Sequence, residues 1–250
     1  MSAEALKSAL CVSEMPSRYF VELREQDTLL PEYRELFDLI GVPQDPIRHP
    51  EGDVWTHTMQ VIDRAAGLRD KASDPFAFML LALTHDFGKT VTTEFLNGRY
   101  HSYGHETAGV SLAERFLERI GVEESKKGYV LAMIPLHMKP GMTVEAHSSV
   151  KTTNHMFDAA ADPRDLLLMA LSDKPRTADF VRFLEERLQL YRETMARPFV
   201  TREDLMAAGV READLPRAVD YAHKLRLSGV EKDLCLRQTI AFAAKRPRPD

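Results

Sequence analysis

Cysteine is scarce in this 250-residue chain, which contains only Cys11 and Cys235. The two residues lie far apart in the sequence and in no Cys-x-x-Cys pattern, so they indicate neither a disulfide framework nor a thiolate zinc site. Low cysteine content of this kind is typical of an intracellular protein. Any metal site is therefore expected to use imidazole and carboxylate ligands.

Long apolar runs are absent as well. No segment approaches the ~18 consecutive apolar residues that would cross a membrane. Residues 1–16 lack the charged start and the long apolar core of a signal peptide. We therefore expect a cytoplasmic protein with no membrane partner.

Positive charge is not in excess, because the formal net charge is −5 at pH 7. Proteins that coat nucleic acid usually carry a strongly basic surface. The composition therefore argues against general nucleic-acid binding and does not support tRNA binding as the main role, although tRNA stays a possible partner. The sequence does not indicate the oligomeric state.

Alternating strand patterns are nearly absent, and apolar residues recur with helical spacing, so we predict an all-α fold. The length suits one large domain or one domain with an appendage. We expect an N-terminal helical segment over residues 1–47, a helical bundle over residues 48–198 and a small helical appendage over residues 199–250.

The segment AFMLLALTHDFGKT, residues 77–90, places His85 and Asp86 at the end of an apolar helix, with Gly88 just past that end. A neutral, hydrogen-bonded histidine is easily buried, but an ionised aspartate without a partner would cost several kcal/mol. A metal cation is one candidate for compensating that cost. Other metal-capable side chains fall on or at the start of further predicted helices: His57, His105, His137 and Asp173.

Imidazole and carboxylate groups suit divalent cations such as manganese, nickel, cobalt, iron, zinc or magnesium. The alternative for each histidine is a hydrogen-bonded core residue, which is the commoner role of a single inward-facing histidine. Lys89 also has two interpretations: it reaches a substrate phosphate as a point charge, or it is a solvated cation at a helix C-terminus.

The order H…HD…H…H…D and the segment HDFGK resemble the HD superfamily of metal-dependent phosphohydrolases. The resemblance implies that one ion is held by four residues: His57, His85, Asp86 and Asp173. It also implies that a second ion, where there is one, is held by His105 and His137 with Asp86 bridging. Met138 stands where some dinuclear members carry a second histidine, so we expect one tight site and leave a second, weaker site open.

Further segments resemble the HD domain and C-terminal region of bacterial CCA-adding tRNA nucleotidyltransferases: GVPQDPIRHPEGDVWTHT, RYHSYGHETAG and PLHMKP. The similarity runs from about residue 14 to residue 196, and residues 48–198 would then be an HD metal-binding domain. The nucleotidyltransferase head of that family needs a Gly-Ser turn and a pair of metal-binding aspartates. This sequence contains no Gly-Ser dipeptide and no Asp-x-Asp pattern. Addition of CCA by this chain alone is therefore not expected.

The resemblance implies a metal-dependent hydrolase of a nucleotide or an RNA-end phosphate, such as a 2′,3′-cyclic phosphate or a 2′-phosphate. Asp86 would hold the metal and accept a proton from water, Lys89 would steady the phosphate, and His101 would contact the substrate. Two alternatives stay open: a di-iron oxygenase, which some dinuclear HD proteins are, and a non-catalytic RNA-processing remnant of a CCA-adding enzyme.

Overall fold

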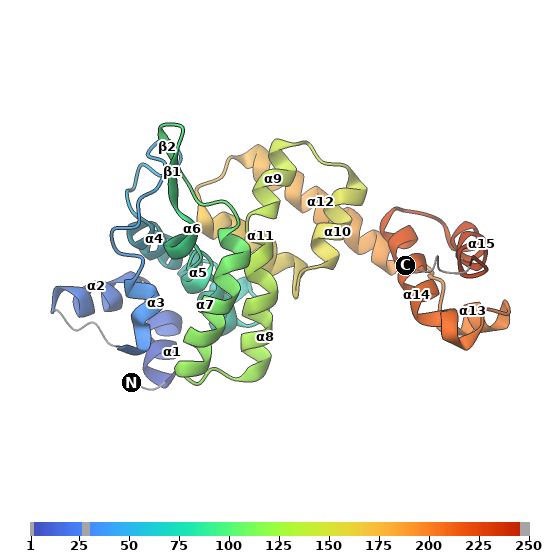
Figure 1. Cartoon of the computed structure of the whole chain (residues 1–250), viewed down its shortest axis with the longest axis horizontal. Coiled ribbons are helices and arrows are strands. Elements are labelled where there is room, and N and C mark those ends of the chain that lie inside the picture. Colours follow the sequence, from blue (N-terminus) through green and yellow to red (C-terminus); the bar gives the residue numbers. More distant parts are fainter. Residues whose placement is uncertain (1–2, 27–30, 246–250) are drawn as a thin grey trace. The chain divides into compact units, whose positions relative to one another are not determined.

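The computed structural model describes residues 3–26 and 31–245 (Figure 1). The chain divides into two compact units, residues 1–142 with 160–178, and residues 143–159 with 179–250. In the part of the chain that is described, helices dominate and a single short hairpin is the only sheet, so the predicted all-α fold is confirmed. The expected domain limits at residues 47/48 and 198/199 stay predictions.

The first unit contains most of the helices and the hairpin. Its α-helices and strands are α1 (Ala3–Val12), α2 (Ser17–Glu25), α3 (Arg34–Phe37), α4 (Val54–Ala66), α5 (Pro75–Thr84), α6 (Lys89–Thr92), β1 (Glu94–Leu96), β2 (Arg99–His101), α7 (His105–Arg119), α8 (Glu124–Met133) and α11 (Pro163–Asp173). Short 3-10 turns are η1 (Pro31–Tyr33), η2 (Arg69–Lys71) and η3 (Ile134–Leu136). Helix α9 (Lys139–Glu145) includes the point at which the chain leaves this unit.

Helix α5 forms the centre of the first unit, where it packs against α1, α4, α8 and α11 (Figure 1). Its start is specified locally, since the Asp74 side chain accepts hydrogen bonds from the backbone N–H groups of Phe76 and Ala77, and Pro75 occupies the first turn. Every residue from Phe76 to Thr84 is buried. A helix that is apolar on all sides belongs inside a bundle, where each large side chain contributes roughly 1.5–3 kcal/mol through burial.

His137 does not lie on a helix, contrary to the prediction from the sequence. Helix α8 ends at Met133, and a 3-10 turn containing Pro135 follows before His137. Proline has no backbone N–H and its ring clashes with the preceding turn, so it cannot continue an α-helix. The chain therefore bends at this point and presents His137 from a turn.

The hairpin of β1 and β2 was not predicted from the sequence. It pairs Glu94 with His101 and Leu96 with Arg99 in antiparallel register. Asn97 and Gly98 form its turn with φ values of 51° and 79°. An Asn-Gly pair with both φ angles positive is typical of a tight hairpin turn, so this dipeptide was the signal that could have revealed it.

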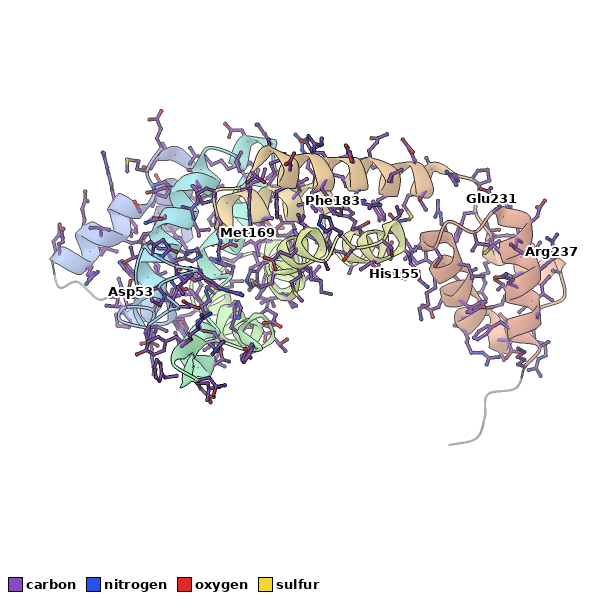
Figure 2. All side chains as sticks on the ribbon, turned by 90° about the horizontal axis from the view of Figure 1, so that it is seen from above. Asp53, His155, Met169, Phe183, Glu231 and Arg237 are labelled. Carbon is purple, nitrogen blue, oxygen red and sulfur yellow. The ribbon has the colours of Figure 1, made fainter. Side chains whose placement is uncertain are left out.

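The second unit holds α10 (Val150–Asp158), α12 (Ala178–Ala196), α13 (Arg202–Ala207), the 3-10 turn η4 (Glu212–Asp214), α14 (Leu215–Leu227) and α15 (Lys232–Ala243), with α12 beginning at its border. Thr201 and Asp204 form a reciprocal capping box at the start of α13. Leu205, Leu215 and Cys235 belong to a small apolar core. Figure 2 labels Glu231 and Arg237, at the start of α15 and within it.

No helix in the described ranges is long and apolar enough to cross a membrane.

Candidate metal centre

Asp86 lies at the centre of a buried group of histidines. It follows α5 in a tight turn, and only 2% of its surface is exposed. Its Oδ2 atom lies 3.2 Å from His85 Nε2 and 3.6 Å from His57 Nε2. Its Oδ1 atom lies 3.3 Å from His105 Nε2 and 3.8 Å from His137 Nε2. The two carboxylate oxygens thus face two different pairs of imidazoles.

Three groups of ligand atoms in the described residues are compact enough to hold an ion, and in each group the three atoms lie within 4.8 Å of one another. Two groups consist of expected ligands only, namely His57 with His85 and Asp173, and Asp86 with His105 and His137. The third group is His49 with Glu51 and His57. All six residues expected as metal ligands therefore come together. They come from α4, the end of α5, the start of α7, the turn after η3 and the end of α11.

The four histidines share one arrangement of their rings. Nδ1 lies 2.8 Å from the Ala82 carbonyl in His85, 2.7 Å from the Ser102 carbonyl in His105, and 2.7 Å from the Ile134 carbonyl in His137. In His57, Nδ1 lies 2.7 Å from the Glu51 carboxylate. Since an oxygen acceptor requires a proton on Nδ1, Nε2 of each neutral ring carries a lone pair directed at the cluster. Metal-binding histidines are typically held in this way.

Several buried atoms of the cluster have no hydrogen-bond partner among the described residues: His85 Nε2, Asp86 Oδ1 and Asp86 Oδ2. In addition, His105 Nε2 and His137 Nε2 lie only 3.3 Å apart. Two imidazole lone pairs at that distance repel each other unless a proton or a cation lies between them. Unpartnered buried polar atoms are costly, and a divalent cation would give these atoms a partner. The donor set fits such an ion.

The carboxylates of the cluster are ionised. Burial alone would raise the pKa of Asp86, but the charges of His85 and Lys89 outweigh burial and hold that pKa well below its ordinary value. Burial likewise opposes ionisation of Asp173, and contact with His57 reverses the effect, so the pKa of Asp173 is lowered. Both groups are therefore available as anionic ligands at neutral pH.

The histidines of the cluster differ in the direction of their pKa shifts. Burial, followed by the nearby charge of His85, lowers the pKa of His137 to about 3, so its ring is neutral at neutral pH. Burial alone would lower the pKa of His57 and His105, but their contacts with Asp173 and Asp86 outweigh burial and raise both pKa values. Since a metal-binding ring must be neutral, protons would compete with a metal ion at His57 and His105.

Lys89 is buried, so the interpretation as a solvated cation is wrong. Its Nζ atom donates a hydrogen bond of 2.8 Å to Gln44 Oε1 and lies 2.7 Å from Asp86 Oδ2. The contact with Asp86 has the distance of an ion pair but not the geometry of a hydrogen bond, because Oδ2 has no hydrogen-bond partner. The lysine thus faces the same oxygen that faces His57 and His85.

Arg64 of α4 fixes the end of α11, which carries Asp173. Its guanidinium donates hydrogen bonds of 2.6 Å to the carbonyls of Ser172 and Asp173. Arg176 Nη2 lies 3.4 Å from Asp173 Oδ2, while Asp173 Oδ1 lies 3.1 Å from His57 Nε2. A cation at the C-terminal carbonyls of a helix is favourable. These contacts orient the Asp173 carboxylate.

Sequence reasoning overlooked the residues that support His57. His49 was not among the residues selected from the sequence, but its Nδ1 lies 2.9 Å from Glu51 Oε1, the same oxygen that accepts from His57. The hydrogen bond with His57, together with further contacts, lowers the pKa of Glu51 to about 2. Glu51 is therefore an anion that fixes the His57 ring. The motif HPEGDVWTH contained the signal, as a glutamate six residues before a candidate ligand.

A cavity of about 430 Å³ opens onto the cluster and is lined by Asp86, His105, His137 and Asp173. Lys89 and His101, the residues expected to contact substrate, also line it. Polar residues that sequence reasoning did not select also line it: Gln44, Asp45, Arg48, His49, Arg99, Tyr100, Ser102, Tyr103, Glu106 and Lys174.

Comparison with known proteins identifies the central part of the chain. Residues 54–175 match the family model described as HD domain. The matched segment begins with α4 and ends just after α11, so it contains all six candidate ligands. The prediction of an HD domain is therefore confirmed.

Curated relatives match about half of the chain. The Multifunctional CCA protein of Actinobacillus pleuropneumoniae serotype 5b is 36% identical over 125 residues, which are 50% of this chain and 30% of the relative. That of Cupriavidus metallidurans is 41% identical over 122 residues, 49% of this chain and 28% of the relative. That of Pasteurella multocida is 31% identical over 164 residues, 63% of this chain and 38% of the relative. The aligned region thus spans about a third of each relative.

Proposed function

We propose, from the premise that residues 54–175 form an HD domain, that this protein is a metal-dependent phosphohydrolase of nucleotide or RNA-end phosphates. The observation that carries the proposal is the Asp86 carboxylate, whose two buried oxygens face two imidazole pairs and have no hydrogen-bond partner among the described residues. The resemblance of the sequence to CCA-adding tRNA nucleotidyltransferases favours RNA ends as the substrate class, with a 2′,3′-cyclic phosphate or a 2′-phosphate as examples, and the relatives named Multifunctional CCA protein agree with that resemblance.

The residues divide into two roles in this proposal. Four of them would hold the first divalent ion: His57, His85, Asp86 and Asp173. His105 and His137 would hold a second ion with Asp86, and the exposed thioether of Met138 adds no hard ligand there. A divalent cation held here would lower the pKa of a water molecule and neutralise charge on a phosphoryl group.

The charges that line the cavity favour an anionic substrate once an ion is bound. Four cations and four carboxylates line the cavity, so its formal charge is balanced when the histidines are neutral and no metal is bound. Each divalent ion would then leave the cavity positive. The cationic residues are Arg48, Lys89, Arg99 and Lys174, and the acidic residues are Asp45, Asp86, Glu106 and Asp173. Asp86 would hold the metal and accept a proton from water. Lys89 would supply a positive charge beside the place where a phosphoryl group would bind.

Metal analysis of freshly purified protein, followed by a substrate screen, tests the proposal. We expect at least one divalent ion per chain. Hydrolysis of 2′-phosphates or 2′,3′-cyclic nucleotides should depend on added manganese, nickel or cobalt and be lost with a chelator. Metal-loaded protein that hydrolyses no phosphoester in this screen would contradict the proposal.

The same preparation tests the alternatives. A di-iron oxygenase would contain two irons per chain and consume oxygen in the presence of substrate. A non-catalytic remnant would bind ligand without turnover. The complete set of six candidate ligands argues against such a remnant, because a decayed site has no reason to keep every ligand.

Replacing Lys89 with glutamine is expected to leave bound metal in place and to lower kcat by about 100- to 1000-fold, as the loss of one charge-stabilising donor typically does. Glutamine removes the charge but keeps an N–H donor on a side chain that is one atom shorter. Metal content and kcat are measured on the same sample, and Lys126→Gln, at an exposed ion pair with Glu123, is the control. Unchanged kcat in metal-replete Lys89→Gln protein would refute the role of Lys89.

A further inference from the structure

The hairpin of β1 and β2 ends at the metal centre. β2 finishes at His101, and the Ser102 carbonyl accepts the hydrogen bond that orients the ring of His105. The Ser102 hydroxyl also lies 2.8 Å from Thr93 Oγ1, which fixes the two ends of the hairpin together. Ser102 is thus tied both to the other end of the hairpin and to the candidate ligand His105. These two contacts hold the neighbouring residues, His101 and Tyr103, close to the metal centre.

Two of those residues, His101 and Tyr103, present stacked rings. Their ring centroids are 5.0 Å apart and their planes differ by 13°. Both residues line the same cavity as Asp86 and His105. The Tyr103 side chain is nevertheless 75% exposed, although aromatic rings usually bury their surface. Among the described residues, Tyr103 makes one ring contact, its stack with His101.

The rest of the cavity fits a ring with an attached phosphate. Met138 and Met142 add polarisable apolar surface to its lining and are 38% and 61% exposed. Arg48 and Lys174 add positive charge, and no carboxylate forms an ion pair with either side chain in the described part of the chain. Aromatic faces beside cations are the combination on which nucleobases stack in proteins that bind single-stranded nucleic acid.

We propose that His101 and Tyr103 form a stacking platform for the base of the substrate, so that the protein selects nucleoside phosphates over phosphate esters that lack a base. This inference rests on the proposed function for the position of the phosphate. The base would stack on Tyr103 at the mouth of the cavity, and the phosphate would lie inside, beside Lys89 and the metal centre.

Calorimetric titration of metal-loaded protein tests the platform with two secondary phosphomonoesters, adenosine 2′-phosphate and glycerol 2-phosphate. The measured quantity is the concentration of ester that half-saturates the protein. The calorimeter yields it from the heat of binding or, where the ester is hydrolysed, from the heat of turnover. Stacking on an aromatic side chain contributes about 1–3 kcal/mol per base, which corresponds to roughly a 5- to 160-fold change. We therefore expect Tyr103→Ala to raise the value for adenosine 2′-phosphate by such a factor and to leave glycerol 2-phosphate unchanged.

Two variants serve as controls. Tyr103→Phe keeps the ring and should behave as the wild type. Phe95→Ala removes another exposed aromatic ring from the same hairpin, one that meets the Tyr100 ring edge to face and does not line the cavity, and should leave both values unchanged.

The outcomes separate this inference from the proposed function. If the two esters half-saturated the wild-type protein at equal concentrations, the platform would be overturned. An equal rise of both half-saturating concentrations in Tyr103→Ala would also overturn it. Base-dependent binding without any release of phosphate would support the platform and contradict the hydrolase.

Discussion

Asp86→Ala is expected to remove both the bound divalent cation and all hydrolysis. The Asp86 carboxylate faces His57 and His85 with one oxygen and His105 and His137 with the other. It would therefore contact every ion that the site holds, and without it the positive charge of an ion would lack its central anion. Metal content by mass spectrometry and phosphate release are the two measurements.

The variant needs a control for folding, because Asp86→Ala leaves the buried Lys89 without its anion. Removing one partner of a buried charge pair can cost about 3–5 kcal/mol. The double variant Asp86→Ala with Lys89→Met removes both charges and should recover thermal stability without recovering metal. Wild-type hydrolysis by folded, purified Asp86→Ala protein would exclude the mechanism, whatever its metal content.

His137→Ala distinguishes one working ion from two. His137 contacts Asp86 Oδ1 and His105 but does not belong to the group formed by His57, His85 and Asp173. If one ion performs the reaction, this variant keeps that ion and only part of the activity is lost. If two ions are needed, metal per chain falls and activity collapses. We expect one tight and one weak ion, because Met138 supplies no hard ligand beside His137.

Four of the candidate ligands could be selected from the sequence because each stands at a place with a local signature. His85 and Asp86 end an apolar run, Asp173 ends a helix that begins with Asp162-Pro163, and His105 begins a helix. Helical periodicity depends on neighbours along the chain, so the all-α fold could be predicted for the same reason. The resemblance to HD domains indicated which of these separate residues share an ion.

The supporting residues could not be predicted because their roles depend on contacts between distant segments. Gln44 is 45 residues from Lys89 in sequence, and Ser172 is 108 residues from Arg64. His49 Nε2 meets Lys174 Nζ at 3.4 Å, across 125 residues. No periodicity encodes such pairs. Burial of Lys89 was missed for the same reason, since a lysine after a helix is usually solvated.

Gly88 does follow the end of α5, as predicted, but the reason for a glycine at this position differs from the expected one. Its position after α5 suggested a helix stop, where glycine typically adopts a positive φ. Its φ is −62°, an ordinary right-handed value that any residue can adopt. The glycine is required by space instead: a Cβ atom at this position would lie 2.0 Å from the His105 carbonyl oxygen and 2.6 Å from the Gly109 nitrogen.

Gly88→Ala is therefore expected to destabilise the protein by about 3 kcal/mol or more, at or beyond the upper end of overpacking costs, because the atoms it meets are backbone and cannot rotate away. Relief would require α7 to move off the turn that carries Asp86, and that shift would separate Asp86 from His105. Denaturant unfolding measures the first effect, and metal content of the folded fraction measures the second.

Gly128→Ala is the matched control, because Gly128 lies in α8 with no atom within 4 Å of an added Cβ. Helix propensity should make that change neutral or stabilising by up to ~1 kcal/mol. If the Gly88→Ala protein kept wild-type stability and its full metal content, α7 could move away from the turn at no cost. The close contact between Gly88 and α7 would then have no part in holding Asp86 beside His105.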